Sequence, residues 1–191
     1  MSNSPFYTEL LTENVNSYEL KTFRIQHDET QLLKYLSKYA KKHNKDSMNR
    51  TYLVRDIESK NIVCFFSLKS ATLPYNDKEE VFLIPATELT HFAVDERYKN
   101  AYNKEDDIRI GEFIFWNHIY PLVMEAKERI AIKNLYIFSI NNPKLLSYYK
   151  NRLGFKEIKN IDDKIFFDYA QQPYEADCKF LYFPIENINQ E

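Results

Sequence analysis

The chain has 191 residues, 44% of them hydrophobic and 16% aromatic, a composition typical of a globular protein and not of a disordered one. Its 26 Lys and Arg against 28 Asp and Glu give a formal net charge of −2, so there is no bulk basic footprint for nucleic acid. A local basic face stays open, because the 26 Lys and Arg are spread along the chain. Two cysteines are too few for a disulfide scaffold, and no apolar run reaches the ~20 residues of a membrane helix. We therefore expect one cytoplasmic domain over residues 1–191, with residues 1–16 as an N-terminal extension and no membrane partner.

The first half of the chain is predicted to be mostly extended. Phe6–Leu11 is assigned a short helical turn within a polar segment. Leucines at helical spacing predict one helix over Glu29–Lys42, with Asp28 as its cap. Pro74–Lys78 holds turn residues. The segments predicted as strands, from their apolar and β-branched residues, are Ser17–Ile25, Thr51–Ile57, Asn61–Leu68, Val81–Ile84 and Ala86–Val94.

The second half is predicted to alternate between helices and strands. Gly111 opens an amphipathic helix, and Asn142-Pro143 starts another that runs to about Arg152, where Gly154 provides a left-handed cap. The strands predicted here are Leu135–Ile140, Phe155–Ile158, Lys164–Tyr169 and Lys179–Pro184. The resulting order, roughly β-α-β-β-β-α-β-α-β-β, indicates a mixed α/β fold with helices on both faces of one sheet.

One stretch organises the candidate function: the strand ATELTHFAV, a long charged loop, and the helix IGEFIFWNHIYPLV that starts at Gly111. The first N–H groups of a helix have no partner within it, and the helix dipole places positive charge there. A helix that follows a strand and a loop in this order is therefore a candidate anion site. Gly111 and Gly154 are the two glycines of the whole chain, so each has a candidate structural role.

Together with the downstream segment LYIFSINNPKLLSYYKNRLGFKEI, this stretch resembles the GNAT superfamily of acyl-CoA-dependent N-acetyltransferases. The resemblance covers roughly Thr51–Ile158. It implies a central mixed, mostly antiparallel sheet with a V-shaped cleft between two splayed parallel strands, Ala86–Val94 and Leu135–Ile140. Acetyl-CoA would be the cosubstrate, with its pantetheine arm along the first strand and its pyrophosphate at the helix start. The cofactor-binding residues that the resemblance implies are Phe92, Ala93, Val94, Arg109, Ile110, Gly111, Glu112, Asn141 and Tyr149.

The catalytic residues that the resemblance implies are Glu88 and Tyr149. ELTHFAV is similar to the strand of histone-type members, which places Glu88 at the general-base position. KLLSYYKNRLGF is similar to a helix whose tyrosine faces the thioester sulfur, and Tyr148 competes with Tyr149 for that role. We choose Tyr149 because Leu145 and Leu146 suggest that Tyr148 joins the buried stripe. Glu88 can alternatively be a structural carboxylate, and His91, on the other face of the strand, a base or a hydrogen-bonded core residue.

The phosphate loop departs from the family pattern. Aligning Gly111 with the last small residue of the motif places Arg109 at its central glycine and Asp106 at its Gln or Arg, and the loop is several residues longer. Arg109 can compensate, because a guanidinium holds phosphate through paired hydrogen bonds. The alternative is a non-catalytic GNAT-fold binding or regulatory module that has lost the usual CoA phosphate binding.

The first interpretation is an N-acetyltransferase that moves an acetyl group from acetyl-CoA to a primary amine of a small molecule, a protein or an aminoacyl-tRNA. The size of the chain and its strand pattern also look like toxin-type acetyltransferases that modify aminoacyl-tRNA, although the acidic balance gives that subclass no support. Aminoacyl-tRNA apart, no nucleic-acid partner is expected, and a homodimer is left open. The histidines at 27, 43, 91 and 118 share no ligand spacing, so no metal site is expected.

Overall fold

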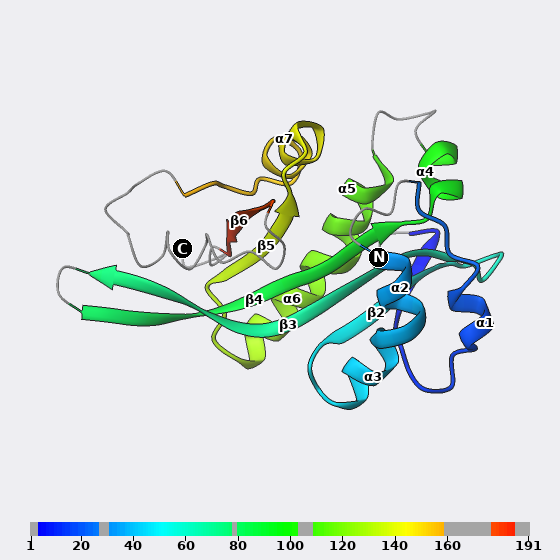
Figure 1. Ribbon diagram of the computed structural model, residues 1–191, viewed down its shortest axis with the longest axis horizontal. Coiled ribbons are helices and arrows are strands. Elements are labelled where there is room, and N and C mark those ends of the chain that lie inside the picture. The colour runs from blue at the N-terminus through cyan, green and yellow to red at the C-terminus, as the bar shows by residue number, and fades with distance from the viewer. Residues whose placement is uncertain (1–3, 27–30, 78–79, 103–108, 159–176, 186–191) are drawn as a thin grey trace. The chain divides into compact units, whose positions relative to one another are not determined.

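The structure, a computed structural model, describes residues 4–26, 31–77, 80–102, 109–158 and 177–185. Its six strands form one sheet in the order β1-β2-β3-β4-β5-β6, which confirms the predicted mixed α/β fold (Figure 1). The chain divides into two compact units, Met1–Lys69 with Thr90–Leu122, and Ser70–Leu89 with Val123–Glu191. The strands are β1 (Phe6–Leu10), β2 (Arg50–Asp56), β3 (Ile62–Asp77), β4 (Glu80–Val94), β5 (Asn134–Ile140) and β6 (Cys178–Pro184).

Two predictions for the N-terminal segment are wrong. Phe6–Leu10 is strand β1, paired antiparallel with β2, and not a helical turn. Ser17–Leu20 is helix α1, and not part of a strand. The Asn16 side chain accepts a hydrogen bond from the Tyr18 N–H at 2.9 Å, so it caps this helix. In segments this short, the neighbouring strand and the cap decide the conformation more than residue propensity does.

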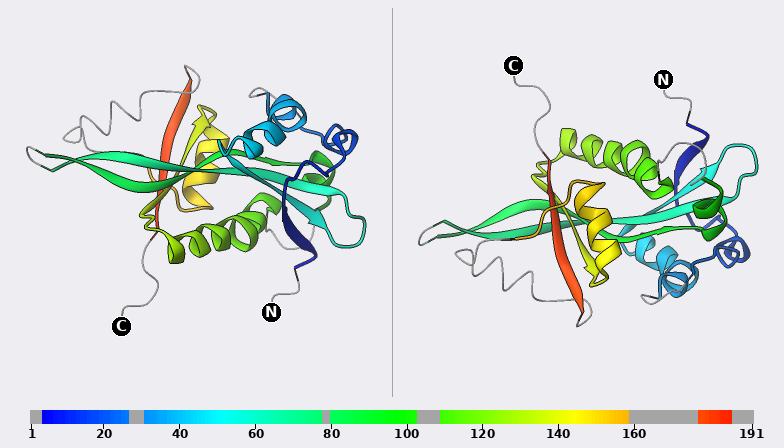
Figure 2. Two further views of the ribbon diagram at one scale, coloured as in Figure 1. Left: turned by 90° about the horizontal axis from the view of Figure 1, so that it is seen from below. Right: turned by 90° about the horizontal axis from the view of Figure 1, so that it is seen from above.

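The first unit carries helices on both faces of its strands (Figure 2). The predicted helix Glu29–Lys42 is observed as α2 (Leu32–Lys34), the π turn η1 (Tyr35–Tyr39) and α3 (Ala40–Lys45). Its predicted cap, Asp28, lies outside the described residues. One core cluster joins this helix to the strands through buried residues that include Leu36, Ala40, Leu53, Phe65 and Ala93.

The opposite face of the first unit is covered by the helix predicted at Gly111. It begins one residue earlier and continues as α5 (Ile110–Ile114), the π turn η2 (Phe115–Ile119) and α6 (Tyr120–Arg129). The two ring nitrogens of His118 bond to β1 and its flank, with Nδ1 2.8 Å from Thr8 Oγ1 and Nε2 3.2 Å from Ser4 Oγ. The Tyr120 N–H donates to the Phe115 carbonyl five residues back, so a wide turn precedes Pro121.

Strands β3 and β4 are both longer than the strands predicted there, and they form a hairpin (Figure 1). The turn predicted at Pro74–Lys78 is wrong for residues 74–77, because β3 continues to Asp77. Lys78 lies outside the described residues. Pro85 does not separate two strands, because β4 runs through it. Proline lacks only the N–H donor, and the Pro85 carbonyl still accepts a hydrogen bond from the Lys133 N–H at 2.9 Å.

The C-terminal elements of the second unit largely follow the prediction. Strand β5 pairs parallel with β4, through Ala86–Glu88 and Asn134–Tyr136, and antiparallel with β6. Helix α7 is observed at Pro143–Asn151. The predicted strand Phe155–Ile158 is reduced to a single bridge between Lys156 and Tyr182, and Lys164–Tyr169 lies outside the described residues. No helix in the described part of the chain has the length and apolar character that a membrane span requires.

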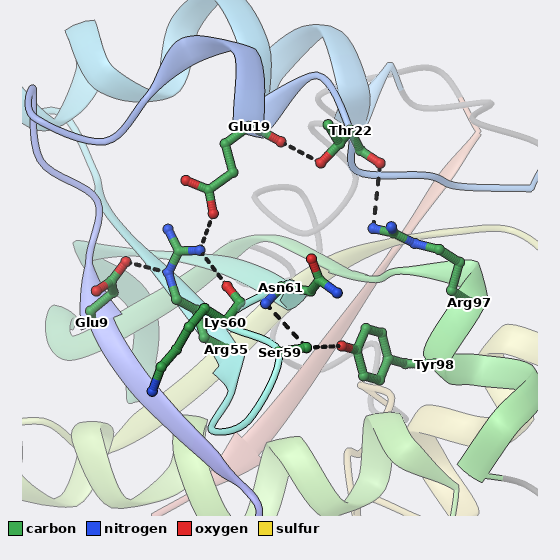
Figure 3. Close-up of polar contacts among 9 residues, drawn as sticks. All are labelled: Glu9, Glu19, Thr22, Arg55, Ser59, Lys60, Asn61, Arg97 and Tyr98. Carbon is green, nitrogen blue, oxygen red and sulfur yellow. Dashed lines mark hydrogen bonds and ion pairs between the residues drawn. The ribbon is translucent and has the colours of Figure 1, made fainter.

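A buried arginine ties the N-terminal elements of the first unit together (Figure 3). The Arg55 guanidinium donates to the carboxylates of Glu9 on β1 and Glu19 on α1, and to the Lys60 carbonyl at 2.8 Å. Burial alone lowers the pKa of Arg55, but the hydrogen bonds to Glu19 and Glu9 outweigh it and raise the pKa above its ordinary value. Arg55 therefore stays charged and holds β1 and α1 against β2.

Candidate active site

The segment predicted to bind the pantetheine arm is the end of β4, in the first unit. The Ala93 side chain is buried in the core cluster against α2–α3, whereas Phe92 and Val94 are half-buried. Strand alternation turns the side chains of Phe92 and Val94 to the opposite face. The following Asp95 N–H donates to the Val63 carbonyl at 2.8 Å, so β3 supports the end of this segment.

The turn after β4 is fixed by Asp95, a residue that the sequence analysis did not select. Its carboxylate is fully buried and accepts from the backbone N–H groups of Arg24 and Arg97, both at 3.0 Å. The Arg97 guanidinium adds contacts of 2.8 and 2.7 Å, and the hydrogen bond to Asp95 raises the pKa of Arg97. Helix α4 (Glu96–Tyr102) starts on this anchor. An Asp directly before a helical segment is the sequence signal that would have identified it.

Two residues just after this turn, Arg97 and Tyr98, contact other segments of the first unit (Figure 3). Arg97 also donates to the Thr22 carbonyl at 3.4 Å, and the Tyr98 hydroxyl lies 3.1 Å from Ser59 Oγ. Their observed contacts give them a structural role at the start of α4.

The four residues predicted for the pyrophosphate are consecutive at the start of the helix that runs to Arg129. Arg109 is exposed and extended, with φ −74° and ψ 133°, and directly precedes the first helical residue, Ile110, which is buried. Gly111 and Glu112 are half-buried in the first turn. Glu112 is favourable to the helix dipole, but its charge opposes a phosphate, so a bound pyrophosphate needs the Arg109 guanidinium as a counter-charge. Asp106 lies outside the described residues.

Replacing Arg109 by alanine should weaken acetyl-CoA binding about 10–150-fold, because a hydrogen bond to a charged group contributes ~1.5–3 kcal/mol. Isothermal titration calorimetry measures this change. Arg129→Ala is the matched control, since Arg129 is an exposed arginine at the far end of the same helix, paired with Glu125 at 3.0 Å. Equal affinities of the two variants would leave Arg109 without a phosphate role.

The predicted general base, Glu88, lies in the second unit and is only 2% exposed. It sits directly opposite Tyr136 in the parallel ladder, and the Tyr136 hydroxyl donates to Glu88 Oε2 at 3.1 Å. The ladder of β4 and β5 ends at this pair, where the resemblance implies that the strands splay. The sequence analysis missed Tyr136, because only the strand register places its ring beside the carboxylate. This hydrogen bond fixes the orientation of the Glu88 carboxylate. A fixed carboxylate suits a general base and equally suits a structural role for Glu88.

Helix α7 carries the two tyrosines that compete for the acid role. The Asn142 side chain accepts from the N–H groups of Lys144 and Leu145, which fixes the start of the helix just after Asn141. Tyr149 is the buried tyrosine, with its ring packed edge-on against Phe155 at 5.7 Å.

Tyr148 is half-buried, so the expectation that it joins the buried stripe in place of Tyr149 is wrong. The helix ends near Gly154, whose φ of 80° is the predicted left-handed conformation. A Cβ at Gly154 would make an ordinary contact of 3.4 Å with the Phe183 ring, so the positive φ and not crowding favours glycine there.

His91 belongs to a separate cluster in the first unit. Its ring stacks on Tyr35 with centroids 3.4 Å apart. Thr90 Oγ1 donates to the Ser67 carbonyl, so it can only accept from His91 Nδ1 at 2.9 Å, and His91 Nε2 then carries the lone pair. Burial, with a smaller effect of His43, lowers the pKa of His91 to about 4. His91 is therefore a neutral, fixed hydrogen-bond acceptor at ordinary pH.

The described residues contain no group of three or more His, Cys, Asp or Glu side chains that could hold a metal ion. The second unit carries a carboxylate–phenol pair at Glu88 and the two tyrosines of α7, and the first unit carries the helix start at Arg109. These groups suit proton transfer and the binding of an anionic cosubstrate.

Neither a protein-family model nor a curated protein matches the chain. Solved structures do. The toxin AtaT complexed with acetyl-methionyl-tRNAfMet is 17% identical, with a TM-score of 0.65, over 94% of this chain and 94% of that one. AtaTR bound with AcCoA is 18% identical, with a TM-score of 0.63, over 94% and 93%. A Tyr-to-Phe mutant of KacT is 16% identical, with a TM-score of 0.66, over 94% and 95%. These neighbours are GNAT-fold proteins, so the chain has the GNAT fold that its sequence predicted.

Proposed function

We propose that this protein is an N-acetyltransferase that moves the acetyl group of acetyl-CoA to a primary amine. The observation that carries the proposal is the GNAT fold with β4, the Asp95 turn and the helix start at Arg109–Glu112 in the required order. The AtaTR structure bound with AcCoA supports the cosubstrate. The reaction then takes place where acetyl-CoA is available, in the cytoplasm.

The acceptor that we favour is the α-amino group of an aminoacyl-tRNA. AtaT complexed with acetyl-methionyl-tRNAfMet is a structural neighbour over 94% of this chain, and this similarity supports that acceptor class over small amines and proteins. AtaT is also seen bound to the C-terminus of the antitoxin AtaR. An antitoxin or a second copy of this chain is a further candidate partner, which co-purification and sedimentation would test.

In the proposed reaction, the amine nitrogen attacks the thioester carbonyl carbon while Glu88, directly or through a water molecule, accepts its proton. Backbone N–H groups of Phe92–Val94 polarise the carbonyl oxygen. When the C–S bond breaks, the electron pair leaves with sulfur, and the Tyr149 hydroxyl protonates the CoA thiolate. Asn141 contacts the pantetheine arm. Arg109, Ile110, Gly111 and Glu112 surround the pyrophosphate.

Acetyl-CoA at 100 times its dissociation constant should stabilise the protein by ~2.7 kcal/mol. For a chain of this length that raises the melting temperature by about 5–11 °C, since each kcal/mol shifts Tm by ~2–4 °C. A thermal-shift titration with acetyl-CoA, with adenosine as a ligand that lacks the pyrophosphate, measures this. No shift at millimolar acetyl-CoA would contradict the proposal.

The second candidate is the non-catalytic GNAT-fold module. The charge of Glu112 in the first helical turn, together with Arg109 in place of a glycine, favours it. A protein that binds acetyl-CoA but transfers no acetyl group to charged tRNA, free amino acids or peptides would support this alternative.

A further inference from the structure

One helix of this acidic protein is rich in lysine and carries no acidic residue. The segment from Gln31 to Lys45, which contains α2, η1 and α3, holds five of the 26 Lys and Arg and none of the 28 Asp and Glu. Four of these lysines are exposed and spaced at i, i+4, i+8 and i+11. We name this set the lysine ridge: Lys34, Lys38, Lys42 and Lys45.

The ridge lysines project into solvent, and the fifth lysine does not. Lys41 Nζ donates to the carbonyl groups of Glu13 and Val15, so Lys41 is a structural residue. Lys34 Nζ donates to Gln31 Oε1 at 2.9 Å. Within the described residues, no ion pair joins a ridge lysine to a carboxylate, although Asp46 directly follows the helix. Among the described residues, the ridge therefore presents positive charge that no carboxylate contacts.

The π turn aligns the ridge. Residues four apart on an α-helix drift by ~40° around the axis, since 3.6 residues make a turn. In η1 the Ala40 N–H donates to the Tyr35 carbonyl five residues back, which takes up one more residue and offsets part of this drift. Lys34, Lys38 and Lys42 are thereby kept closer to one line along the helix.

An aromatic column adjoins the ridge. Tyr39 is 43% exposed between Lys38 and Lys42 in the sequence, and its ring stacks on His43 with centroids 6.1 Å apart. His43 contacts Tyr35 at 5.6 Å, and Tyr35 stacks on His91 of β4.

Tyr35 is rigidly held at the inner end of this column. Its hydroxyl bonds to Thr51 Oγ1 and Asn49 Nδ2, both at 3.1 Å, and to Ser67 Oγ at 3.3 Å. The column therefore connects the exposed Tyr39 ring with His91, one residue before the Phe92–Val94 segment assigned to the thioester.

We propose that the lysine ridge and Tyr39 form the surface on which this protein holds the sugar–phosphate backbone and an unpaired base of an RNA, the aminoacyl-tRNA acceptor. The inference rests on the function proposed above. Lysines in a row meet successive phosphates as point charges, and an exposed tyrosine face stacks with any base. The same combination fits an acidic protein less well, because the negative π face of the Tyr39 ring attracts a base and not a carboxylate.

The test measures binding of 3′-labelled, uncharged bulk tRNA to the full chain by fluorescence anisotropy between 50 and 200 mM KCl. Each lost phosphate contact lowers the salt slope by ~0.7–0.9. In the double variant Lys38→Ala/Lys42→Ala, the slope of log affinity against log salt concentration should be shallower by about 1.4–1.8. Raising the salt fourfold should therefore cost this variant ~7–12-fold less affinity than it costs the parent. The exposed lysines Lys133 and Lys156 provide the control, Lys133→Ala/Lys156→Ala, which should keep the parent slope.

Tyr39 is tested in the same assay. Tyr39→Ala should weaken tRNA binding by about 5–150-fold, and Tyr39→Phe, which keeps the ring, should bind like the parent. If the Lys38→Ala/Lys42→Ala variant binds tRNA with the affinity and the salt dependence of the parent, the proposal is overturned. It is also overturned if the parent binds polyglutamate through the ridge but does not bind tRNA. Acetyl-CoA thermal shifts are measured in parallel. If neither the parent nor any variant shows a thermal shift with acetyl-CoA, the acetyltransferase function is contradicted. The tRNA-binding measurements still test the lysine ridge in that case.

Discussion

The Glu88→Gln variant should transfer acetyl groups ~10²–10⁴-fold more slowly than the parent, the usual contribution of a general base. Glutamine keeps the shape of the side chain, and its carbonyl oxygen can still accept from the Tyr136 hydroxyl, so the buried pair survives. What disappears is the capacity to accept a proton. The rate of the parent rises with pH as its base ionises, and this acidic limb should vanish in the variant. Transfer of labelled acetyl from acetyl-CoA to charged bulk tRNA measures both effects.

Tyr136→Phe separates catalysis by Glu88 from its orientation. The phenylalanine ring preserves the stack on Phe180, where centroids are 5.4 Å apart, and removes only the donor to Glu88. We expect a smaller loss of rate than in Glu88→Gln, with the acidic limb retained. A Glu88→Gln protein with the rate and pH profile of the parent would make the carboxylate structural.

Tyr149→Phe should lower turnover ~10²-fold or more, because a general acid contributes ~10²–10⁴ to the rate. A phenol is protonated at neutral pH and can donate as the C–S bond breaks. The phenylalanine ring still packs against Phe155, so the affinity for acetyl-CoA and the melting temperature should stay close to those of the parent. Single-turnover kinetics and calorimetry distinguish the two quantities.

Tyr148→Phe is the matched control on the neighbouring position of α7. It removes the same hydroxyl from a half-buried ring and should change turnover little. The control is needed because the structure buries Tyr149 and not Tyr148, contrary to the expectation on which the choice of Tyr149 rested. If Tyr148→Phe loses turnover and Tyr149→Phe does not, the acid is Tyr148. Full activity of both would exclude this helix as the source of the proton.

Several local features around the candidate site could be predicted from the sequence. Gly111 within one residue of a helix start, Asn142-Pro143 at another and Gly154 in a left-handed conformation are local features, since caps and glycine conformations depend on neighbouring residues. Strand alternation separated Glu88 from His91. The partners of these residues were not visible, because Tyr136 beside Glu88 and Tyr35 beside His91 come from segments 48 and 56 residues away.

The sequence by itself determined the elements with a strong apolar pattern: the helix at Gly111 and the strands Leu135–Ile140 and Thr51–Ile57. Only the tertiary structure decided the weakly patterned segments. Phe6–Leu10 is a strand because β2 offers it a partner. Pro74 and Pro85 lie within the long strands β3 and β4, and the Pro85 carbonyl is satisfied by the Lys133 N–H. The alignment of Lys34, Lys38 and Lys42 along the helix likewise depends on the π turn in η1. Local hydrogen bonds and residue spacing depend on residues that are close in the sequence, whereas strand partners and buried pairs form only when distant segments pack together.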